Sequence, residues 1–539
     1  MEARKKAHQV TIIWKLVVIM ALAAFNFISV PVMGDDDSPV GHFGRGSHED
    51  NMRKMQAFKA SLMRGGHGFV SHSSAAPHSQ PQPRPPKAWR RSSPAARVYY
   101  MSDFGGDPTG VMDSTEHIQA LLLAAAGQGP SPDAQGVMSG AGSGPSEGSL
   151  TAGVPNQAGT ADFEGGTYKV SKPVQVPPGG NIVIKDGTIQ ASNDFPEGGP
   201  VFDASPKQPP PAENTESFVD DVEPAQLSDP DPSSFSFEYV TFQNIMIDSN
   251  HRGAGISLSN ALRTSIENVY VAHFSTTGIN VHPSSSETYI SNSFLGQHPN
   301  AGRDPREGNF TGTAINLSGT NNALTDVVLF ASAVGVDVSG HGNTLSGVHC
   351  YNKATRFGGT GIYLRKPGLG LGRNRIINSY LDYTGIVAED PLQLHISNSF
   401  FRGDAFVALK SIKGVVSGVN IVDNTFSGSN KGTGIVQLQQ SNGPFNKINQ
   451  VVVDRNSVRG MSMKATVANG AVQGNGTSFT LDFNPVLLFP NRITHAQYSL
   501  IVTNGAFPNH VLRSVCNNRV VVATNVPVSA TVFATVDQN

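Results

Sequence analysis

A small residue followed by alternating apolar and polar positions recurs along the second half of the chain. The stretches with this pattern are GAGISL, TTGINV, GTAINL, AVGVDV, GTGIYL, YTGIVA, DAFVAL and GTGIVQL. Their pivot residues lie mostly 20 to 29 positions apart, with one interval of 36, and they are Gly255, Gly278, Ala314, Gly335, Gly361, Gly385, Ala405 and Gly434. Alternation with a period of two predicts short strands. Repeats of this length predict a solenoid, because one repeat cannot bury its apolar face alone.

An asparagine recurs at a similar spacing, just ahead of a second short apolar run. It occurs in FQNIMI, IENVYV, ISNSFL, IINSYL, ISNSFF and VDNTFS, as Asn244, Asn268, Asn292, Asn378, Asn398 and Asn424. Asparagine tolerates the left-handed backbone needed where one strand turns into the next. Its amide can also hydrogen-bond to the amide of the next coil. Together the two patterns predict an all-β fold, a right-handed parallel β-helix.

Each end of the predicted β-helix has a segment suited to cover it. Residues 114–126 predict a helix with one apolar face, made of Ile118, Leu121, Leu122 and Ala125. We expect Asp113 to cap this helix, Glu116 to act as its capping-box partner and Gly127 to end it. Strand-like runs after about residue 460 predict a small β-rich C-terminal region that covers the other end.

The composition of the remaining segments predicts which of them lie outside the folded β-helix. Residues 1–34 place basic side chains before an apolar run, which predicts a cleaved signal peptide, with a membrane anchor as the alternative. Residues 35–97 are rich in His, Ser, Pro, Gly and Arg and predict a disordered linker. A Gly/Ser tract at 127–160 and a Pro/acidic tract at 203–234 should loop out of the fold. The expected boundaries are 98–460 for the β-helix and 461–539 for the C-terminal region.

Net charge and cysteine content narrow the functional classes. A formal net charge of −2 gives no global field for nucleic acid or a membrane surface. Cys350 and Cys516 form neither a disulfide framework nor a metal site, although a single bridge between them stays open. Asn309, Asn316 and Asn475 lie in N-x-S/T sequons, which predict glycosylation of a secreted protein. We expect a monomer that needs no metal or cofactor and has no stable membrane partner.

A locally basic block marks residues 353–413. This segment contains nine basic residues and only four acidic residues. The basic residues are Lys353, Arg356, Arg365, Lys366, Arg373, Arg375, Arg402, Lys410 and Lys413, and the acidic residues are Asp382, Glu389, Asp390 and Asp404. Such a block suits an anionic polysaccharide such as polygalacturonate. The alternative is a solvated face with ion pairs between coils, since Lys410 falls near the level of Glu389 and Asp390.

Two aspartates in this block are candidates for a catalytic pair. Asp404 directly precedes the pivot Ala405, where neighbouring repeats hold threonine, and Asp382 lies three residues before Gly385. On one face, two residues (about 7 Å) and one coil (about 4.8 Å) place the carboxyl groups roughly 8 Å apart. Inverting glycosidases hold theirs about 6.5–9.5 Å apart, leaving room for a water molecule. The alternative is that both aspartates only cap strand ends.

Several longer motifs resemble a known family. DFGGDPTGVMDSTEHIQALLLAA resembles the opening of pectate-lyase-superfamily β-helix proteins. The run from GVHCYN to ALKSIKG, with VVVDRNSV and DFNPVLLFP, is similar to the plant QUARTET-type polygalacturonases. The resemblance covers about residues 98–539. It implies a secreted hydrolase of cell-wall pectin, linked in the type member to the release of pollen from tetrads.

The resemblance extends to parts of the polygalacturonase site motifs. GDAFVALKS resembles the Gly-Asp-Asp strand, with Ala405 in place of the second Asp. DYTG falls where Asn-Thr-Asp-Gly is expected and puts Thr384 at the acid position. His341 lies in a Gly-His-Gly, upstream of Asp404 rather than downstream, and no Arg-Ile-Lys follows. By resemblance Asp404 is the general acid, and the identity of the general base is left open.

The function predicted is hydrolysis of α-1,4-galacturonan by direct displacement. Asp404 would protonate the leaving oxygen and Asp382 would activate water, while Lys410 and Arg365 would engage uronate carboxylates. Three alternatives stay open: a pectate lyase, a non-catalytic pectin-binding solenoid, and a hydrolase of another glycan.

Overall fold

The computed structural model describes residues 52–53, 56–57, 97–128, 159–206, 235–297, 310–351, 360–368, 372–503, 505 and 507–539. The predicted signal peptide and nearly all of the predicted linker lie outside these residues, as does most of each low-complexity tract. Asn309, Lys353 and Arg356 also lie outside them.

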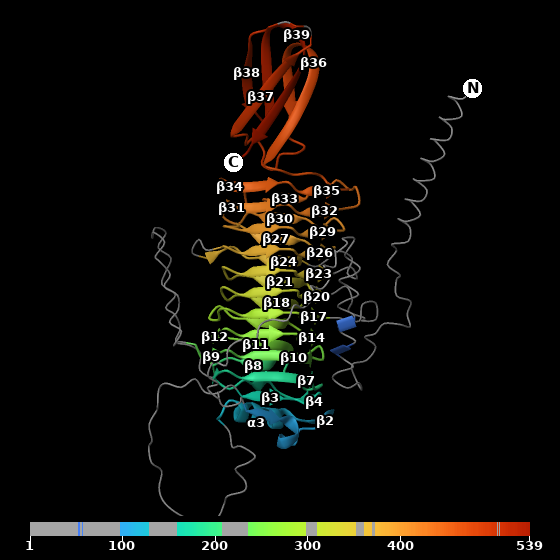
Figure 1. The fold of residues 1–539 in the computed structure, drawn as a ribbon, viewed down its shortest axis with the longest axis vertical. Helices are drawn as coiled ribbons and strands as arrows, with labels where there is room; N and C mark the ends of the chain where they lie inside the picture. Colours follow the sequence, from blue (N-terminus) through green and yellow to red (C-terminus); the bar gives the residue numbers. More distant parts are fainter. Residues whose placement is uncertain are drawn as a thin grey trace, which may run out of the picture.

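Stacked coils of short parallel strands form most of the molecule (Figure 1). Each full coil contributes one strand to each of three ladders. The first ladder consists of β1 (Val98–Tyr100), β3 (Thr160–Asp162), β7 (Val183–Ala191), β10 (Thr241–Asp248), β13 (Ser265–Glu267), β16 (Tyr289–Ser291), β19 (Ala323–Thr325), β22 (Thr344–Ser346), β25 (Arg375–Ile377), β28 (His395–Ser397), β31 (Val415–Val422) and β34 (Lys447–Asp454).

The second ladder follows the first within each coil. It consists of the second halves of β7 and β10, together with β2 (Thr109–Asp113), β4 (Thr167–Val170), β14 (Tyr270–Ala272), β17 (Phe294–Gly296), β20 (Val328–Phe330), β23 (His349–Tyr351), β26 (Tyr380–Asp382), β29 (Phe400–Arg402), β32 (Thr425–Ser427) and β35 (Ser457–Arg459).

The third ladder is a separate ten-stranded parallel sheet. Its strands are β5 (Val174–Gln175), β8 (Pro200–Ala204), β11 (Ala254–Leu258), β15 (Thr277–Val281), β18 (Thr313–Leu317), β21 (Val334–Val338), β24 (Thr360–Leu364), β27 (Ile386–Glu389), β30 (Val407–Lys410) and β33 (Val436–Gln439). A short sheet of β6 (Gly179–Gly180), β9 (Phe237–Glu238) and β12 (Ala261–Leu262) lies between the third and first ladders of the early coils. The predicted right-handed parallel β-helix is confirmed.

The recurrent asparagines mark the corner between the first and second ladders. Five of the six have positive φ of 49–53°, namely Asn244, Asn268, Asn292, Asn378 and Asn398. The predicted amide stacking is present, since Asn268 Nδ2 donates to Asn244 Oδ1 at 2.8 Å. The sixth assignment is wrong: Asp423 occupies that corner with φ 57°, and Asn424 points into the core.

Matching aliphatic columns and a few polar side chains fill the interior. On the third ladder, Ile256, Ile279 and Ile315 stack directly over one another and are buried. Burying a side chain of this size stabilises the fold by about 1.5–3 kcal/mol. Buried amides form a second internal stack, in which Asn343 Oδ1 accepts from Asn322 Nδ2 at 2.9 Å. These buried polar groups are therefore hydrogen-bonded from coil to coil.

The N-terminal cap is the helix α3 (Thr115–Ala125), which follows a 3₁₀ turn, η1 (Met101–Phe104). Ile118, Leu121 and Leu122 are fully buried against the first coils, and Gly127 ends the helix with φ 70°. The predicted capping box is only partly present. Asp113 Oδ1 accepts a hydrogen bond from the N–H of Thr115 at 3.0 Å, but the N-cap residue is Ser114. Glu116 does not reach back and forms an ion pair with Lys172 instead.

A four-stranded antiparallel sheet follows the last coil and lies at the other end of the β-helix (Figure 1). Its strands are β36 (Val467–Asp482), β37 (His495–Val502), β38 (His510–Cys516) and β39 (Arg519–Asp537). The sheet has its own apolar core, but Leu488 and Phe489 pack into the core of the β-helix. Cys516, on this sheet, is exposed, Cys350 is buried in the β-helix, and both are free thiols.

No helix in the described ranges is both long enough and apolar enough to cross a bilayer.

Candidate active site

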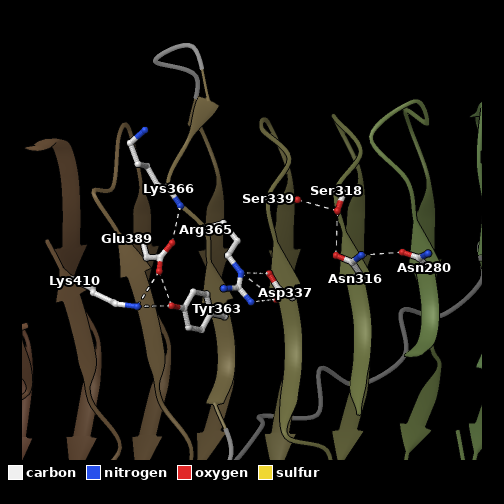
Figure 2. A network of polar contacts seen from close by, with 10 residues as sticks. All are labelled: Asn280, Asn316, Ser318, Asp337, Ser339, Tyr363, Arg365, Lys366, Glu389 and Lys410. Carbon is white, nitrogen blue, oxygen red and sulfur yellow. Dashed lines mark hydrogen bonds and ion pairs between the residues drawn. The ribbon is translucent and has the colours of Figure 1, made fainter. Parts of the chain in front are cut away.

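The outer face of the third ladder carries a continuous row of polar side chains. Strand alternation explains it: on β24, Ile362 and Leu364 point into the core, so Tyr363 points outward. Tyr363 is in register with Asp337 on β21. Two residues further along the strands, Glu389 of β27 is in register with Lys410 of β30. We call Asp337, Tyr363, Arg365, Glu389 and Lys410 the outer-face network (Figure 2).

Arg365 connects the first carboxylate of this network to the aromatic ring. Its Nε donates to Asp337 Oδ1 at 3.0 Å, and its Nη2 to Oδ2 at 2.5 Å. The guanidinium carbon also lies 4.1 Å from the centroid of the Tyr363 ring. The hydrogen bond to Asp337 raises the pKa of Arg365, so this cation stays charged.

Glu389 receives three hydrogen bonds. The Tyr363 hydroxyl donates to its Oε1 at 2.6 Å and Lys410 Nζ donates to the same oxygen at 3.0 Å. The backbone N–H of Lys366 donates to Oε2 at 3.2 Å. Burial alone would raise the pKa of Glu389, but Tyr363 and Lys410 outweigh it and hold that pKa below its ordinary value. Glu389 is therefore a carboxylate at neutral pH.

Towards the N-terminal coils, the row continues with uncharged side chains. Asn316 Nδ2 donates to Asn280 Oδ1 at 2.8 Å, and Ser318 Oγ donates to Asn316 Oδ1 at 3.1 Å (Figure 2). Ser339 Oγ donates to Ser318 Oγ at 2.8 Å. Asn316 is one of the predicted glycosylation sites, so a glycan there would stand on this row. The row therefore offers uncharged hydrogen-bonding groups next to a charged network.

The structure brings together the two predicted substrate-binding residues, Lys410 and Arg365, through Tyr363. Lys410 Nζ lies 2.9 Å from the Tyr363 hydroxyl and 5.6 Å from the ring centroid. The expected proximity of Lys410 and Glu389 is confirmed as an ion pair at 3.0 Å.

The register of the two predicted catalytic aspartates differs from the one expected. Ile386 pairs with Val407 and Val407 with Val436. The pivot column therefore continues from Gly385 to Phe406 and Ile435, and the assignment of Ala405 and Gly434 to it is wrong by one residue. Asp404 lies level with Tyr383, and both have left-handed backbones, with φ 63° and 59°. Asp404 is a corner residue, not a strand residue.

The carboxylates of Asp404 and Asp382 have different surroundings. Asp404 Oδ1 accepts from Ser429 N at 2.8 Å and its Oδ2 from Ser429 Oγ at 2.5 Å. Asp382 ends β26 with 4 % of its surface exposed, and its Oδ1 lies 4.0 Å from Arg402 Nε. Asp404 thus tethers the next coil, and Asp382 lies beside a cation of the second ladder.

Thr384 and Ala405 occupy the positions where the polygalacturonase motifs have acids. They lie level on adjacent coils, and both are buried, with 3 % and 1 % of their surface exposed. Neither can supply a carboxylate.

Sequence reasoning missed Asp337 and Tyr363, and considered Glu389 only as a neighbour of Lys410. Asp337 lies two residues after the pivot Gly335, and Tyr363 two residues after Gly361. Reading the outward position two residues after each pivot would have aligned them. Among the described residues, no group of three His, Cys, Asp or Glu side chains is placed to hold a metal ion.

Sequence comparison identifies a relative that matches almost the whole chain. Polygalacturonase QRT3 of Arabidopsis thaliana is 50 % identical over 499 residues, which cover 91 % of this chain and 92 % of that protein. The chain belongs to the QRT3-type polygalacturonases. No family model matches the sequence.

Solved structures with similar folds are more distant from this QRT3-type chain. ORF18 of Geobacillus virus E2 has a TM-score of 0.46 at 15 % identity, covering 79 % of this chain and 76 % of its own. A tailspike protein of E. coli bacteriophage HK620, in complex with a hexasaccharide, has a TM-score of 0.45 at 10 % identity, covering 82 % and 93 %.

Proposed function

We propose that this protein hydrolyses α-1,4-galacturonan on the outer face of the third ladder. The main support for this proposal is the outer-face network, in which two carboxylates and two cations surround Tyr363 on adjacent coils. The family relationship to polygalacturonase QRT3 supports the reaction and the substrate. A stack of parallel strands gives an extended face, which suits an extended polymer.

Arg365 and Lys410 are proposed to bind uronate carboxylates of the polymer. An arginine binds a carboxylate through two parallel N–H donors, and a lysine through a point charge. In the unliganded protein these cations hold Asp337 and Glu389. A uronate that takes Lys410 removes one of the contacts that hold the pKa of Glu389 low. Substrate binding would therefore raise that pKa and help Glu389 to carry a proton.

Asp337 and Glu389 are proposed as the catalytic acid–base pair. They lie on β21 and β27, with β24 between them. Two strand spacings of about 4.8 Å, with an offset of two residues (about 7 Å) along the strands, put their backbone positions roughly 12 Å apart. Inverting glycosidases separate their carboxyl groups by about 6.5–9.5 Å, so the inverting reaction that we propose requires the two side chains to lean toward each other. In Figure 2 the two carboxylates lie on either side of Tyr363 and Arg365. We propose that Glu389 protonates the leaving oxygen, because uronate binding at Lys410 would raise its pKa, and that Asp337 activates water.

The sequence-based pair of Asp404 as acid and Asp382 as base stands as a second proposal for the same reaction. Its support is the resemblance of GDAFVALKS to the Gly-Asp-Asp strand. The outer-face pair is favoured because Asp382 is buried, and because Asp337 and Glu389 lie beside two cations that could bind uronate carboxylates.

Reducing-sugar release from sodium polygalacturonate, with and without a chelator, tests the function. We expect release by the wild type, and a loss of about 100-fold or more in kcat/KM for E389Q and D337N. E267Q, an exposed carboxylate on the first ladder, is the matched control and should keep full activity. Full activity of E389Q and D337N with inactive D404N and D382N would move the reaction to the corner pair.

The reaction products distinguish hydrolysis of galacturonan from the alternative functions. Products with a 4,5-unsaturated end would identify a lyase and contradict hydrolysis. Retention on polygalacturonate without any product would identify a binding protein. Release of sugar from another glycan alone would contradict the choice of substrate.

We further propose that the protein is secreted to the plant cell wall, acts there as a monomer and contributes to microspore separation. Exposed Asn475, on β36, is the described sequon best placed for a glycan. A fluorescent fusion located in the wall and a glycosidase-sensitive mass would support secretion, and intracellular retention would contradict it.

A further inference from the structure

A hollow of about 730 Å³ lies on the outer face of the first ladder, beside the strands β25, β28 and β31. It is not part of the outer-face network. Arg365 of that network and Arg373 of this hollow are eight residues apart in the sequence. A smaller hollow lined by Arg365, Glu389 and Leu394 adjoins it, and Leu394 lines both.

Positive charge distinguishes this hollow. The guanidinium groups of Arg373 and Arg375 line it, and its described lining residues include no carboxylate. Arg375 is in register with His395, and His395 with Asn420, so one outward column crosses three coils. Arg373 and Arg375 are both exposed. The hollow is therefore an open cationic surface.

The corner that holds Arg373 is built differently in earlier coils. Arg263 and Arg373 occupy the same corner position, two residues before the first-ladder strand, and both have left-handed backbones. Arg263 forms an ion pair at 2.8 Å with Glu287 of the next coil. The residue that corresponds to Glu287 beside Arg373 is Gln393, which accepts from Arg373 Nε at 3.1 Å but carries no charge. The corner at Arg373 therefore has the same backbone position as the corner at Arg263, but it lacks the carboxylate that neutralises the arginine there.

A carboxylate near the hollow already has a cationic partner of its own. Asp423, which lies close enough for His395 to affect its pKa, is held by Arg455 through two hydrogen bonds of 2.9 Å. Burial and the charge of Arg373 lower the pKa of His341 on the preceding coil. The Arg373 charge therefore acts on a residue of a neighbouring coil.

We propose that this hollow is an accessory binding site for a uronate-bearing polysaccharide, separate from the hydrolytic face. Arg373 and Arg375 would bind carboxylates through paired N–H donors. The amides of Asn378, Gln393 and Asn420 offer donors and acceptors for sugar hydroxyls. The choice of polymer rests on the proposed function, whereas the cationic hollow does not.

Affinity electrophoresis in gels with sodium polygalacturonate tests the site. All proteins carry E389Q and D404N, so that the polymer is not consumed whichever acid pair acts. We expect R373Q/R375Q to weaken retention about tenfold. R263Q, which changes the corner arginine already paired with Glu287, is the matched control and should retain the parental mobility. Unchanged melting temperatures confirm that all variants are folded.

The outcomes separate this inference from the proposed hydrolysis. Equal retention of R373Q/R375Q and R263Q would overturn the accessory site, even if the wild type hydrolyses galacturonan. Retention that depends on Arg373 and Arg375 would support it, even if no hydrolysis is found. In gels with fully methyl-esterified pectin, which lacks free carboxylates, all variants should be retained equally. An equal loss of retention in gels with dextran sulfate would contradict a uronate-specific site.

Discussion

Tyr363 holds the outer-face network together through both ends of its side chain. The ring lies under Arg365, and the hydroxyl contacts both Glu389 and Lys410. The hydroxyl and the ring can therefore be tested separately, because phenylalanine keeps the ring and removes only the hydrogen bond.

Y363F should raise the pKa of Glu389. Its carboxylate loses one hydrogen bond that favours the charged form, while burial and Lys410 stay. Because Glu389 is the proposed general acid, we expect the alkaline limb of the pH–rate profile to move up by about one pH unit or less. Carbon NMR of Glu389 should show the same shift without substrate. Y289F, an exposed tyrosine on the first ladder, should leave both unchanged, and an unshifted Glu389 in Y363F would refute this account.

The same variant should change how stability depends on pH. Because folding lowers the pKa of Glu389, its contacts stabilise the protein above the unfolded value near 4.5 and lose this effect as pH falls through the folded value. In Y363F this loss should be smaller and should be complete at a higher pH. Denaturant midpoints measured between about pH 3 and 6 would show it.

The corner asparagines predict a second residue-scale effect. Asn268 has φ 52° and donates to Asn244. N268V should lower the free energy of unfolding by about 1–3 kcal/mol, because valine is strained in the left-handed region and lacks the amide. N268G keeps the backbone and loses only the hydrogen bond, so it should cost about 1 kcal/mol. Equal costs in denaturant unfolding would show that backbone strain does not matter there.

At the scale of elements, α3 covers the open end of the first coils. Leu121 is fully buried, whereas its neighbour Leu123 is only partly buried. L121A should lower the free energy of unfolding by about 2–5 kcal/mol, the usual cost of truncating a core leucine. L123A is the matched control and should cost clearly less. Chemical denaturation compares them, and equal losses would contradict the role of α3 as a packed cap.

The strands could be predicted from the sequence, and so could the corners, but the register of the last coils could not. Small pivots are required where backbones approach: a Cβ at Gly278 would meet the Ala314 carbonyl oxygen at 2.5 Å. That requirement ends at β30, where Phe406 stands in the column, and the small Ala405 one residue earlier imitates a pivot. The error moved Asp404 from a corner to a strand and suggested the wrong geometry for the acid pair.

The site was harder to predict than the fold for a related reason. Lys410 and Arg365 could be selected because basic residues cluster in the sequence. Asp337 lies 52 residues before Glu389, and only the coil-to-coil register brings them around Tyr363. A single polar residue in an alternating strand does not indicate a site by itself. The residues that stack on it in neighbouring coils must be known first.

At the scale of the whole molecule, the C-terminal sheet is joined to the β-helix by apolar packing. Phe489 has 1 % of its surface exposed and lies in the β-helix core, and Arg492 Nη2 donates to Ile448 O at 2.7 Å. The sheet is therefore a cover for the last coil as well as a unit with its own core.

F489A should loosen this cover. We expect the free energy of unfolding to fall by about 3–5 kcal/mol, the usual cost of removing a buried phenylalanine. Phe507 is fully exposed, so F507A should change it by less than about 0.5 kcal/mol. Protease cleavage between the two units should also become faster in F489A alone. Equal stability of the two variants would show that the sheet folds without help from the coils.

Register on the third ladder survives large differences in repeat length. Thr277 pairs with Thr313, 36 positions later, and Thr313 with Val334, only 21 positions later. Chain length between strands and alignment of strands are thus uncoupled in this architecture. Mutation can lengthen or shorten a connection without shifting the proposed substrate-binding face, so new specificities can arise in the loops while the coils are inherited intact.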